Sequence, residues 1–227
     1  MEMVQELTFI SYMVHILSQN HSVVNRFIAE IRDAMIQKDR MRFRRNMERI
    51  GEICAYEISK KLLYKETEVI TPLGIATVMM PMEEPVLATI LRAGLPLHQG
   101  LLNYFDHADN AFISAYRRHH KDGSFDIRLE YVSSPELSNR VVILSDPMLA
   151  TGQSMVMTYR AILEKGRPQH THIVCALASA QGIDYVKKNL PQGISLWVGA
   201  VDEELTAQSF IVPGLGDAGD LAFGEKS

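Results

Sequence analysis

The chain has 227 residues, of which 47% are hydrophobic and 22% charged, a balance typical of a soluble globular protein with an ample core. Its net charge of −4 gives no general attraction to nucleic acid or anionic membranes, so an anion site has to be built locally. No run of 18 apolar residues predicts a membrane span, and the N-terminus lacks the basic region and cleavage pattern of a secretory signal. Cys54 and Cys175 lie far apart in apolar surroundings, which predicts two buried thiols. These features together predict a cytoplasmic protein.

The first third of the chain predicts helices. Apolar residues recur at helical spacing from Val23 to Met35, and again from Phe43 to Ile58. Basic residues crowd the stretch RMRFRRNMERIGE (40–52), which could contact nucleic acid, although a solvated helix face with acids one turn away is the favoured interpretation. We therefore expect a helical N-terminal region over residues 1–65, within a single domain that spans residues 1–227.

From about residue 70, short apolar runs alternate with segments of helical length. This alternation predicts an α/β fold with an open, mainly parallel sheet and flanking helices, because strands that are apolar throughout are buried on both faces. Residues 126–132 alternate instead between apolar and polar, which predicts a more exposed strand or flap. The expected strands are 74–80, 85–91, 110–116, 140–146, 171–178 and 194–201, and the expected helices between them are 94–105, 153–166 and 180–190.

The stretch ILSDPMLATGQS (143–154) combines a strand end, an acid and a loop of mostly small residues. The strand brings Asp146 to its carboxyl end, where open parallel sheets bind ligands. The loop amides and the positive end of the next helix, near Gln153 or Ser154, can hold a phosphate, and a nucleotide P-loop is excluded because its G-x-x-x-x-G-K-[ST] pattern is absent. An acid repels a bare anion but binds hydroxyls, so a sugar phosphate is predicted. An ordinary strand-to-helix turn is the alternative for this stretch alone.

DPMLATGQS resembles the signature with which uracil phosphoribosyltransferases bind 5-phospho-α-D-ribose 1-diphosphate (PRPP). The resemblance extends to YEIS (56–59), ILRAGL (90–95) and AYRR (115–118), and covers most of the chain from about residue 40. Its most specific element is FIVPGLGDAGDLAFG (210–224), which resembles the uracil-binding segment of that family. Two features depart from the family pattern: Gln153 stands in place of a second glycine, and DEELTAQSF (202–210) differs from the usual preceding segment.

The resemblance implies a type I phosphoribosyltransferase fold with a small hood for the base, in which residues 200–227 form the base-binding segment. A glycine-rich backbone can approach a flat ring closely, which suits this role. The family implies that uracil contacts Ile211, Gly216, Asp217 and Ala218, and that Asp146, Arg117 and Asp217 are catalytic. It implies PRPP contacts from Arg92, Arg117, Asp146, Pro147, Met148, Leu149, Ala150, Thr151, Gly152, Gln153, Ser154 and Asp217. Basic residues 118–121 are expected to form a flap near the diphosphate.

The implied reaction turns uracil and PRPP into UMP and diphosphate in pyrimidine salvage, with Mg²⁺ as cofactor and its protein ligands unassigned. Family members form homo-oligomers, so a dimer or tetramer is expected, and many are activated by GTP. No nucleic acid or membrane partner is expected. Two alternatives stay open: a phosphoribosyltransferase for another nucleobase, such as a purine or orotate, and a regulator of the same fold that binds RNA.

Overall fold

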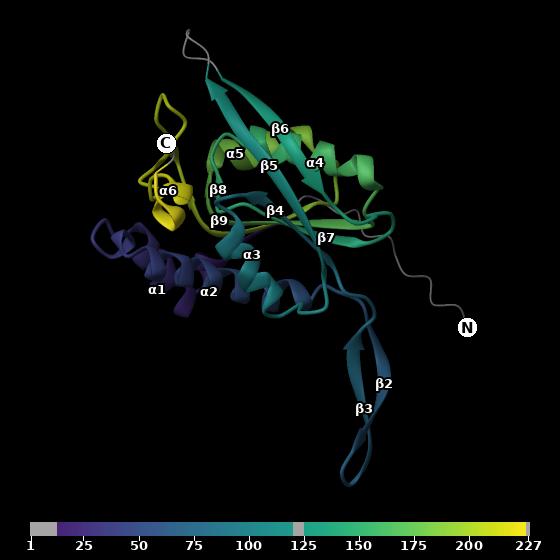
Figure 1. The fold of residues 1–227 in the computed structure, drawn as a ribbon. Coiled ribbons are helices and arrows are strands. Elements are labelled where there is room, and N and C mark those ends of the chain that lie inside the picture. Colours follow the sequence, from purple (N-terminus) through teal and green to yellow (C-terminus); the bar gives the residue numbers. More distant parts are fainter. Residues whose placement is uncertain (1–12, 120–124, 226–227) are drawn as a thin grey trace.

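The computed structural model describes residues 13–119 and 125–225, and it describes their side chains except between 115 and 129. Within these residues the centre of the molecule is an eight-stranded sheet with the order β1-β10-β9-β7-β4-β5-β6, and the short β8 lies beside β9 (Figure 1). Every pairing is parallel except β5 with β6. The predicted α/β fold with an open, mainly parallel sheet is confirmed.

Five of the six apolar runs predicted as strands lie in this sheet, joined by the exposed strand predicted near residues 126–132. The strands are β1 (Met13–Ile16), β4 (Val86–Leu91), β5 (Asp109–His119), β6 (Phe125–Ser133), β7 (Val141–Ser145), β8 (Met148–Leu149), β9 (His170–Ser179) and β10 (Ser195–Asp202).

Helices cover both faces of the sheet (Figure 1). The α-helices are α1 (Val23–Arg32), α2 (Arg40–Ser59), α3 (Leu95–Leu102), α4 (Gln153–Ile162), α5 (Ala180–Asn189) and α6 (Ala218–Phe223), and short 3-10 turns lie at η1 (Leu17–Gln19), η2 (Ile36–Lys38) and η3 (Leu163–Lys165).

The two faces of the sheet have separate hydrophobic cores. Along β9, Val174 and Ala176 pack with α1, α2 and α3, whereas Ile173 and Cys175 pack with α4 and α5. Because successive side chains of a strand point to opposite faces, both sets have to be apolar. This two-sided burial explains the unbroken apolar runs in the sequence.

Helix α2 confirms the second predicted apolar stripe. Asp39 caps its start and accepts a hydrogen bond from the Arg42 backbone N–H at 3.0 Å. Its buried face consists of side chains at helical spacing: Phe43, Met47, Ile50, Cys54 and Ile58.

Part of the basic run on α2 serves to hold α1. The Arg42 guanidinium donates to both carboxylate oxygens of Glu30, at 2.7 and 2.9 Å, and the Asn46 amide adds a bond of 2.8 Å. These hydrogen bonds, chiefly those from Arg42, lower the pKa of Glu30 to about 2. Arg45 pairs with Glu48 at 2.6 Å on the same helix. The basic run therefore stabilises the helical layer. Acidic residues lie close to it, as expected from the interpretation of this stretch as a helix face with acids nearby.

The N-terminal region departs from the prediction in two places. Residues Met13–Ile16 form the edge strand β1, parallel to β10, and not a helix. In the first apolar stripe Val24, Ile28 and Ile31 are buried, whereas the Val23 and Met35 side chains at its ends are 59% and 74% exposed. Apolar character alone could not separate a short edge strand from a helix, because both bury apolar residues.

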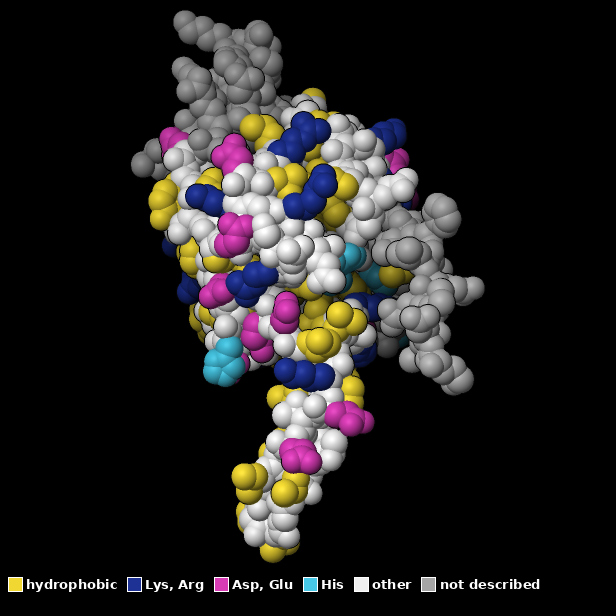
Figure 2. All heavy atoms as spheres, turned by 90° about the vertical axis from the view of Figure 1, so that its right-hand side faces the viewer, with side chains coloured by type: hydrophobic (Ala, Val, Ile, Leu, Met, Phe, Trp, Pro, Cys, Tyr) yellow, Lys and Arg dark blue, Asp and Glu magenta, His cyan; other side chains and the backbone are white. Residues whose placement is uncertain are grey.

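Residues 74–80 do form a strand, but their predicted place in the buried parallel sheet is wrong. They belong to β3 (Gly74–Pro81), which among the described residues pairs with β2 (Tyr64–Thr71) alone, in an antiparallel hairpin that projects from the body (Figure 1). Figure 2 shows apolar side chains along this hairpin and at its tip. The Ile70 and Leu73 side chains there are 88% and 101% exposed.

The two cysteines and the helices agree with what the composition predicts. Cys54 and Cys175 are buried and free, as predicted, and burial raises the pKa of Cys54 to about 12. Among the residues that the structure describes, no helix is long and apolar enough to cross a membrane.

Candidate active site

The candidate site lies where the neighbouring parallel strands β4 and β7 end. Thr89 of β4 is in register with Ser145 of β7, and its hydroxyl donates to the Ser145 carbonyl oxygen at 3.3 Å. Asp146 directly follows β7, and its backbone N–H donates to the Val174 carbonyl of β9 at 3.0 Å. Arg92 follows β4. The sheet therefore brings Asp146 and Arg92, 54 positions apart in sequence, to the same edge.

The loop after Asp146 has two parts. Its beginning is tied to the sheet, because Pro147 O accepts hydrogen bonds from the Ala176 and Leu177 backbone N–H groups, and Met148–Leu149 pairs with β9. The remainder, residues 150–154, connects this short strand to α4. A hollow of about 20 Å³ lies between Asp146 and the start of α4, which is room for one small group.

Gly152 ends the loop as the N-cap of α4. Its φ of +78° lies in the left-handed region, and a Cβ atom there would come within 2.8 Å of the Gly182 carbonyl oxygen. Glycine is required on both grounds. Gly152 brings no side chain to cap the helix, and the Thr151 hydroxyl accepts a long hydrogen bond from the Gln153 backbone N–H at 3.4 Å. The amino end of α4 can therefore still bind an anion.

The C-terminal segment, defined as residues 202–224, forms a second wall beside this edge. It contains the antiparallel strands β11 (Glu204–Leu205) and β12 (Ile211–Val212), a glycine turn, and α6. Asp217 caps α6, since its Oδ1 atom accepts from the Gly219 and Asp220 backbone N–H groups at 2.8 and 3.0 Å.

Two arginines from the helical layer anchor the C-terminal segment. Arg32 of α1 donates to both carboxylate oxygens of Asp202 at 2.8 Å and to the Gly214 carbonyl at 3.1 Å, and Asp202 also accepts from the Gly214 N–H at 3.1 Å. Arg44 of α2 donates to the Ala222 carbonyl at 2.7 Å. Sequence reasoning missed these residues. The available signal was an acid, Asp202, directly after an apolar strand, which is also the position of Asp146.

Arg92 joins the C-terminal segment to the sheet edge. Its Nη2 atom donates to Asp220 Oδ1 at 2.8 Å and to the Gly224 carbonyl oxygen at 2.6 Å. Sequence reasoning assigned Arg92 to a phosphate ligand and did not anticipate this contact. Asp220 was missed because DAGD contains two acids and only Asp217 carried the resemblance.

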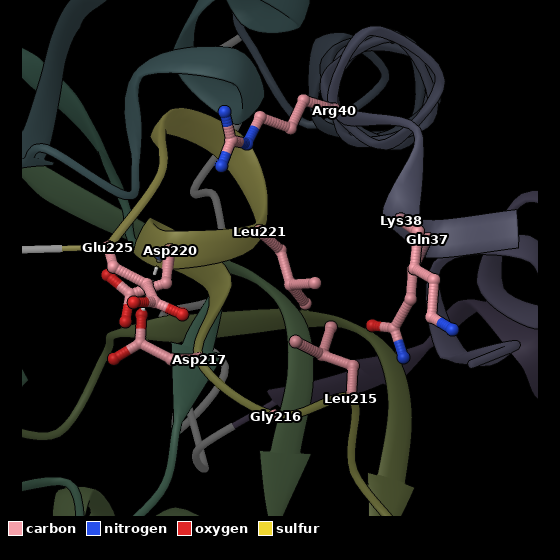
Figure 3. A pocket seen from close by; sticks show the side chains of 9 residues that line it. All are labelled: Gln37, Lys38, Arg40, Leu215, Gly216, Asp217, Asp220, Leu221 and Glu225. Carbon is pink, nitrogen blue, oxygen red and sulfur yellow. Dashed lines mark hydrogen bonds between the residues drawn. The ribbon is translucent and has the colours of Figure 1, made fainter. Parts of the chain in front are cut away.

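A pocket of about 310 Å³ opens between the C-terminal segment and the start of α2 (Figure 3). In Figure 3 the carboxylates of Asp217, Asp220 and Glu225 gather on one side and Lys38 and Gln37 lie on the other. Gly216 lies on the wall with φ +95°, and a Cβ atom there would meet no other atom within 4 Å. The pocket is lined by Gln37, Lys38, Arg40, Leu215, Gly216, Asp217, Asp220, Leu221 and Glu225.

The other predicted site residues are distributed as follows. Ile211 and Ala218 are each 4% exposed as whole residues and so are buried, whereas Gln153 is exposed at the start of α4. Arg117 lies on β5 three residues beyond Ser114, the partner of Leu91 at the end of β4, so the β5 backbone extends past the sheet edge. The side chains of Arg117 and of the expected basic flap, residues 118–121, lie outside the described part.

Comparisons with known proteins agree with this architecture. A family model described as "Uracil phosphoribosyltransferase" matches residues 18–225. A uracil phosphoribosyltransferase from Porphyromonas gingivalis is 54% identical over 210 residues, covering 92% of this chain and 97% of the relative. One from Methanothermobacter thermautotrophicus is 39% identical over 187 residues, covering 82% and 85%. The solved structure of the AQ2163 protein from Aquifex aeolicus has a TM-score of 0.83 and 29% identity, covering 93% of this chain and 98% of that chain.

The sheet is mainly parallel, a loop suited to phosphate lies at its carboxyl edge, and the C-terminal segment forms a separate hood. These features define a phosphoribosyltransferase of the type I fold. The matches extend over both the sheet and the hood. The chain belongs to the uracil phosphoribosyltransferase family, whose members are pentosyltransferases. The resemblance inferred from the motifs is thereby confirmed.

Proposed function

We propose that the protein transfers the phosphoribosyl group of PRPP to uracil, forming UMP and diphosphate in pyrimidine salvage. One observation carries the proposal beyond family membership: the open amino end of α4 with Asp146, and the glycine turn of the C-terminal segment, meet at one sheet edge through Arg92. A phosphate site beside a backbone-lined base site is what this reaction requires.

The phosphate loop, residues 146–154, is the proposed site for the phosphoribosyl group. Residues 147–149 anchor it to β9, and the amides of residues 150–154 hold the 5′-phosphate at the positive end of α4. Asp146 accepts hydrogen bonds from the ribose hydroxyls. Arg92 and Arg117 bind the diphosphate, for which a guanidinium fork is well suited.

The C-terminal segment is the proposed base site. Uracil is flat and presents alternating acceptors and a donor, which the backbone groups near Ile211 and from Gly216 through Ala218 can match. The positive φ of Gly216 and the open space at its Cβ position let the main chain approach the ring. A backbone N–H that binds uracil O4 disfavours cytosine, whose amino group leaves it unpaired at a cost of about 1–3 kcal/mol.

The chemistry needs no protein nucleophile. Uracil N1 bonds to C1 of the ribose as the C1–oxygen bond breaks, the electron pair leaves with diphosphate, and the N1 proton passes to solvent. Positioning and neutralisation of charge lower the barrier. The Asp146 carboxylate holds the ribose and favours the positive charge that develops at C1, as in glycoside hydrolysis.

Mg²⁺ would bind at this site together with the diphosphate, and protein side chains would supply few of its ligands. No group of three or more His, Cys, Asp or Glu side chains in the described part could hold a metal. The exposed carboxylate of Asp217 has one oxygen in the α6 cap and can add a single ligand. Mg²⁺ binds in this way when substrate phosphates and waters fill most of its coordination sphere, and it offsets the charge of the leaving group.

Turnover of uracil with PRPP and Mg²⁺, followed by UMP formation, tests the proposal, with cytosine, hypoxanthine and orotate as competing bases. We expect UMP and no other nucleotide. Transfer to another base instead of uracil would support the rival nucleobase enzyme. Salt-dependent RNA binding without diphosphate release would support the regulator. Adding GTP to the same assay shows whether this member is activated by it.

We further propose that the protein is a cytoplasmic homo-oligomer. Two free, buried cysteines agree with a reducing compartment. An isolated two-stranded hairpin is marginal in water, and β2–β3 exposes apolar side chains such as Ile70 and Leu73, which favours packing against a second copy of the chain. The double variant Ile70→Ser with Leu73→Ser should shift the mass measured by light scattering toward the monomer, and an unchanged mass would argue against this interface.

A further inference from the structure

The contact between Arg92 and Asp220 links the two proposed halves of the site. Arg92 lies at the carboxyl end of β4, and Asp220 lies in the first turn of α6, 128 positions later. The same Nη2 atom also binds the Gly224 carbonyl, which is the C-cap position of α6. One guanidinium therefore holds both ends of the short helix whose first residues form the proposed base site.

The donors of Arg92 divide between two sides. Both contacts come from Nη2, and within the described part of the chain no atom accepts a hydrogen bond from Nη1. The side chain is 33% exposed, and Nη1 is not among the buried nitrogens that lack a partner, which leaves it as the donor for a ligand. Arg92 Nε is buried without a partner, and it lies 3.7 Å from the position of a Cβ atom on Gly219. Arg92 can thus hold α6 with one nitrogen and a diphosphate oxygen with another.

We propose that Asp220 is a positioning residue that, through Arg92, couples occupation of the PRPP site to the geometry of the base-binding segment. This inference rests on the proposed function. A diphosphate bound to Nη1 restrains the guanidinium plane, and Nη2 then restrains Asp220 and Gly224. The Gly216–Ala218 backbone follows, because Asp217 caps the same helix.

At Gly219, helix α6 lies at ordinary van der Waals distance from the turn that carries Arg92. A Cβ atom there would lie 3.7 Å from both the Arg92 Nε atom and the Ala93 Cβ atom, so α6 packs directly on the turn after β4. With so little between them, a shift of the Arg92 turn is passed to α6. Sites coupled through a shared element typically change each other's affinity by roughly 5- to 150-fold.

Hydrogen exchange of residues 214–224, with and without PRPP and Mg²⁺ and in the absence of uracil, tests the proposal without relying on turnover. We expect PRPP to slow exchange in wild type by about fivefold or more, and in Asp220→Asn by about twofold or less. Each protein is measured with PRPP at about ten times its own Kd. Initial rates over a grid of uracil and PRPP concentrations should show the uracil KM of Asp220→Asn rising roughly fivefold at saturating PRPP, with the PRPP KM changed by less than about threefold.

Two further variants separate coupling from simple stabilisation. Glu225→Gln removes the same charge from the same pocket but leaves the Arg92 contact, so the PRPP-dependent protection should remain as in wild type. Arg92→Lys has one ammonium group in place of the fork, cannot hold both sides, and should lose the protection. If the contact were merely structural, Asp220→Asn would have a lower melting temperature, but PRPP would slow its hydrogen exchange as much as in wild type.

The outcomes are distinguishable. The coupling is overturned if the wild-type enzyme is active and PRPP slows hydrogen exchange in Asp220→Asn as much as in wild type. The proposed function then still stands. Equal loss of protection in Asp220→Asn and Glu225→Gln also overturns it, since charge alone would then be responsible. A wild-type protein that forms no UMP overturns the proposed function itself.

Discussion

The phosphate loop and the C-terminal segment, the two walls of the proposed site, are held in different ways. The loop is held by main-chain pairing with β9 and by close approaches at Gly152 and Gly182, all within the sheet and its nearest helices. The C-terminal segment is held by side chains from distant parts of the chain, namely Arg32, Arg44 and Arg92.

This difference separates fixed from adjustable geometry. Main-chain pairing inside a packed sheet leaves little freedom, so the first part of the phosphate loop, residues 147–149, is held in place by the sheet itself. Partly exposed arginine contacts are weaker and can be rearranged, so the position of the C-terminal segment depends on which contacts are made. For the proposed reaction, a rigid anchor for the phosphoribosyl group and an adjustable wall for the base would suit a two-substrate transfer.

The largest expected effect comes from Asp146→Asn, which alters the chemistry of the rigid wall without altering its backbone. We expect kcat to fall about 10²- to 10³-fold, because a neutral amide stabilises neither the ribose hydroxyls nor the developing cation as well. The melting temperature should stay within a few degrees of wild type. Steady-state UMP formation measures the effect, and normal kinetics would remove Asp146 from the reaction.

A matched glycine pair tests rigidity directly. Gly152→Ala combines a left-handed φ with a collision against Gly182 O, whereas Gly216→Ala has the same kind of φ in open space. We expect Gly152→Ala to lose about 2–4 kcal/mol of unfolding free energy and Gly216→Ala about 1–2 kcal/mol.

The kinetic consequences of the pair should also differ. The PRPP KM should rise in Gly152→Ala, roughly tenfold, and the uracil KM should rise in Gly216→Ala. Denaturant unfolding and substrate titrations give both quantities. The reverse assignment of the two KM effects would place phosphate and base on the opposite walls.

Arg32→Ala should release the C-terminal segment while sparing the phosphate loop. It leaves Asp202, whose side chain is 8% exposed, without its bidentate partner, and should cost about 2–3 kcal/mol. We expect the uracil KM to rise about fivefold with little change in the PRPP KM. Asp202→Asn is the control, since it removes the charge but keeps an acceptor for the Gly214 N–H. A loss of PRPP binding equal to that of uracil would show that the walls are not independent.

The smallest expected effect concerns the stability of the fold at low pH. The carboxyl of Glu30, with a folded-state pKa lowered to about 2 mainly by the Arg42 hydrogen bonds, stabilises the fold above its unfolded value near 4.5. That contribution is lost as the pH falls from about 4.5 toward 2. The stability gap between wild type and Glu30→Gln, about 1 kcal/mol at pH 7, should therefore shrink in this window. The exposed Glu66→Gln is the control.

The elements that sequence reasoning predicted correctly and the contacts that it missed differ in kind. The strand end before Asp146 and the helix after Gly152 follow from local patterns, so their elements were found at the right places. The bonds of Arg92 to Asp220 join residues 128 positions apart, and nothing in either stretch of sequence indicates the other. The hairpin β2–β3 was misplaced because exposed apolar residues give the same sequence pattern as apolar residues buried in a core.

By itself the sequence determined the type of most main elements, the parallel sheet, the acid and glycine loop after β7, and the family. Those properties depend on hydrophobic period, turn chemistry and short motifs, which are local along the chain. Only the tertiary structure decided that Arg92 faces α6, that Arg32 and Asp202 anchor the glycine turn, and that β3 projects from the body. These depend on the path of the chain through space, because contacts between distant residues are set by packing of the whole sheet and its helices.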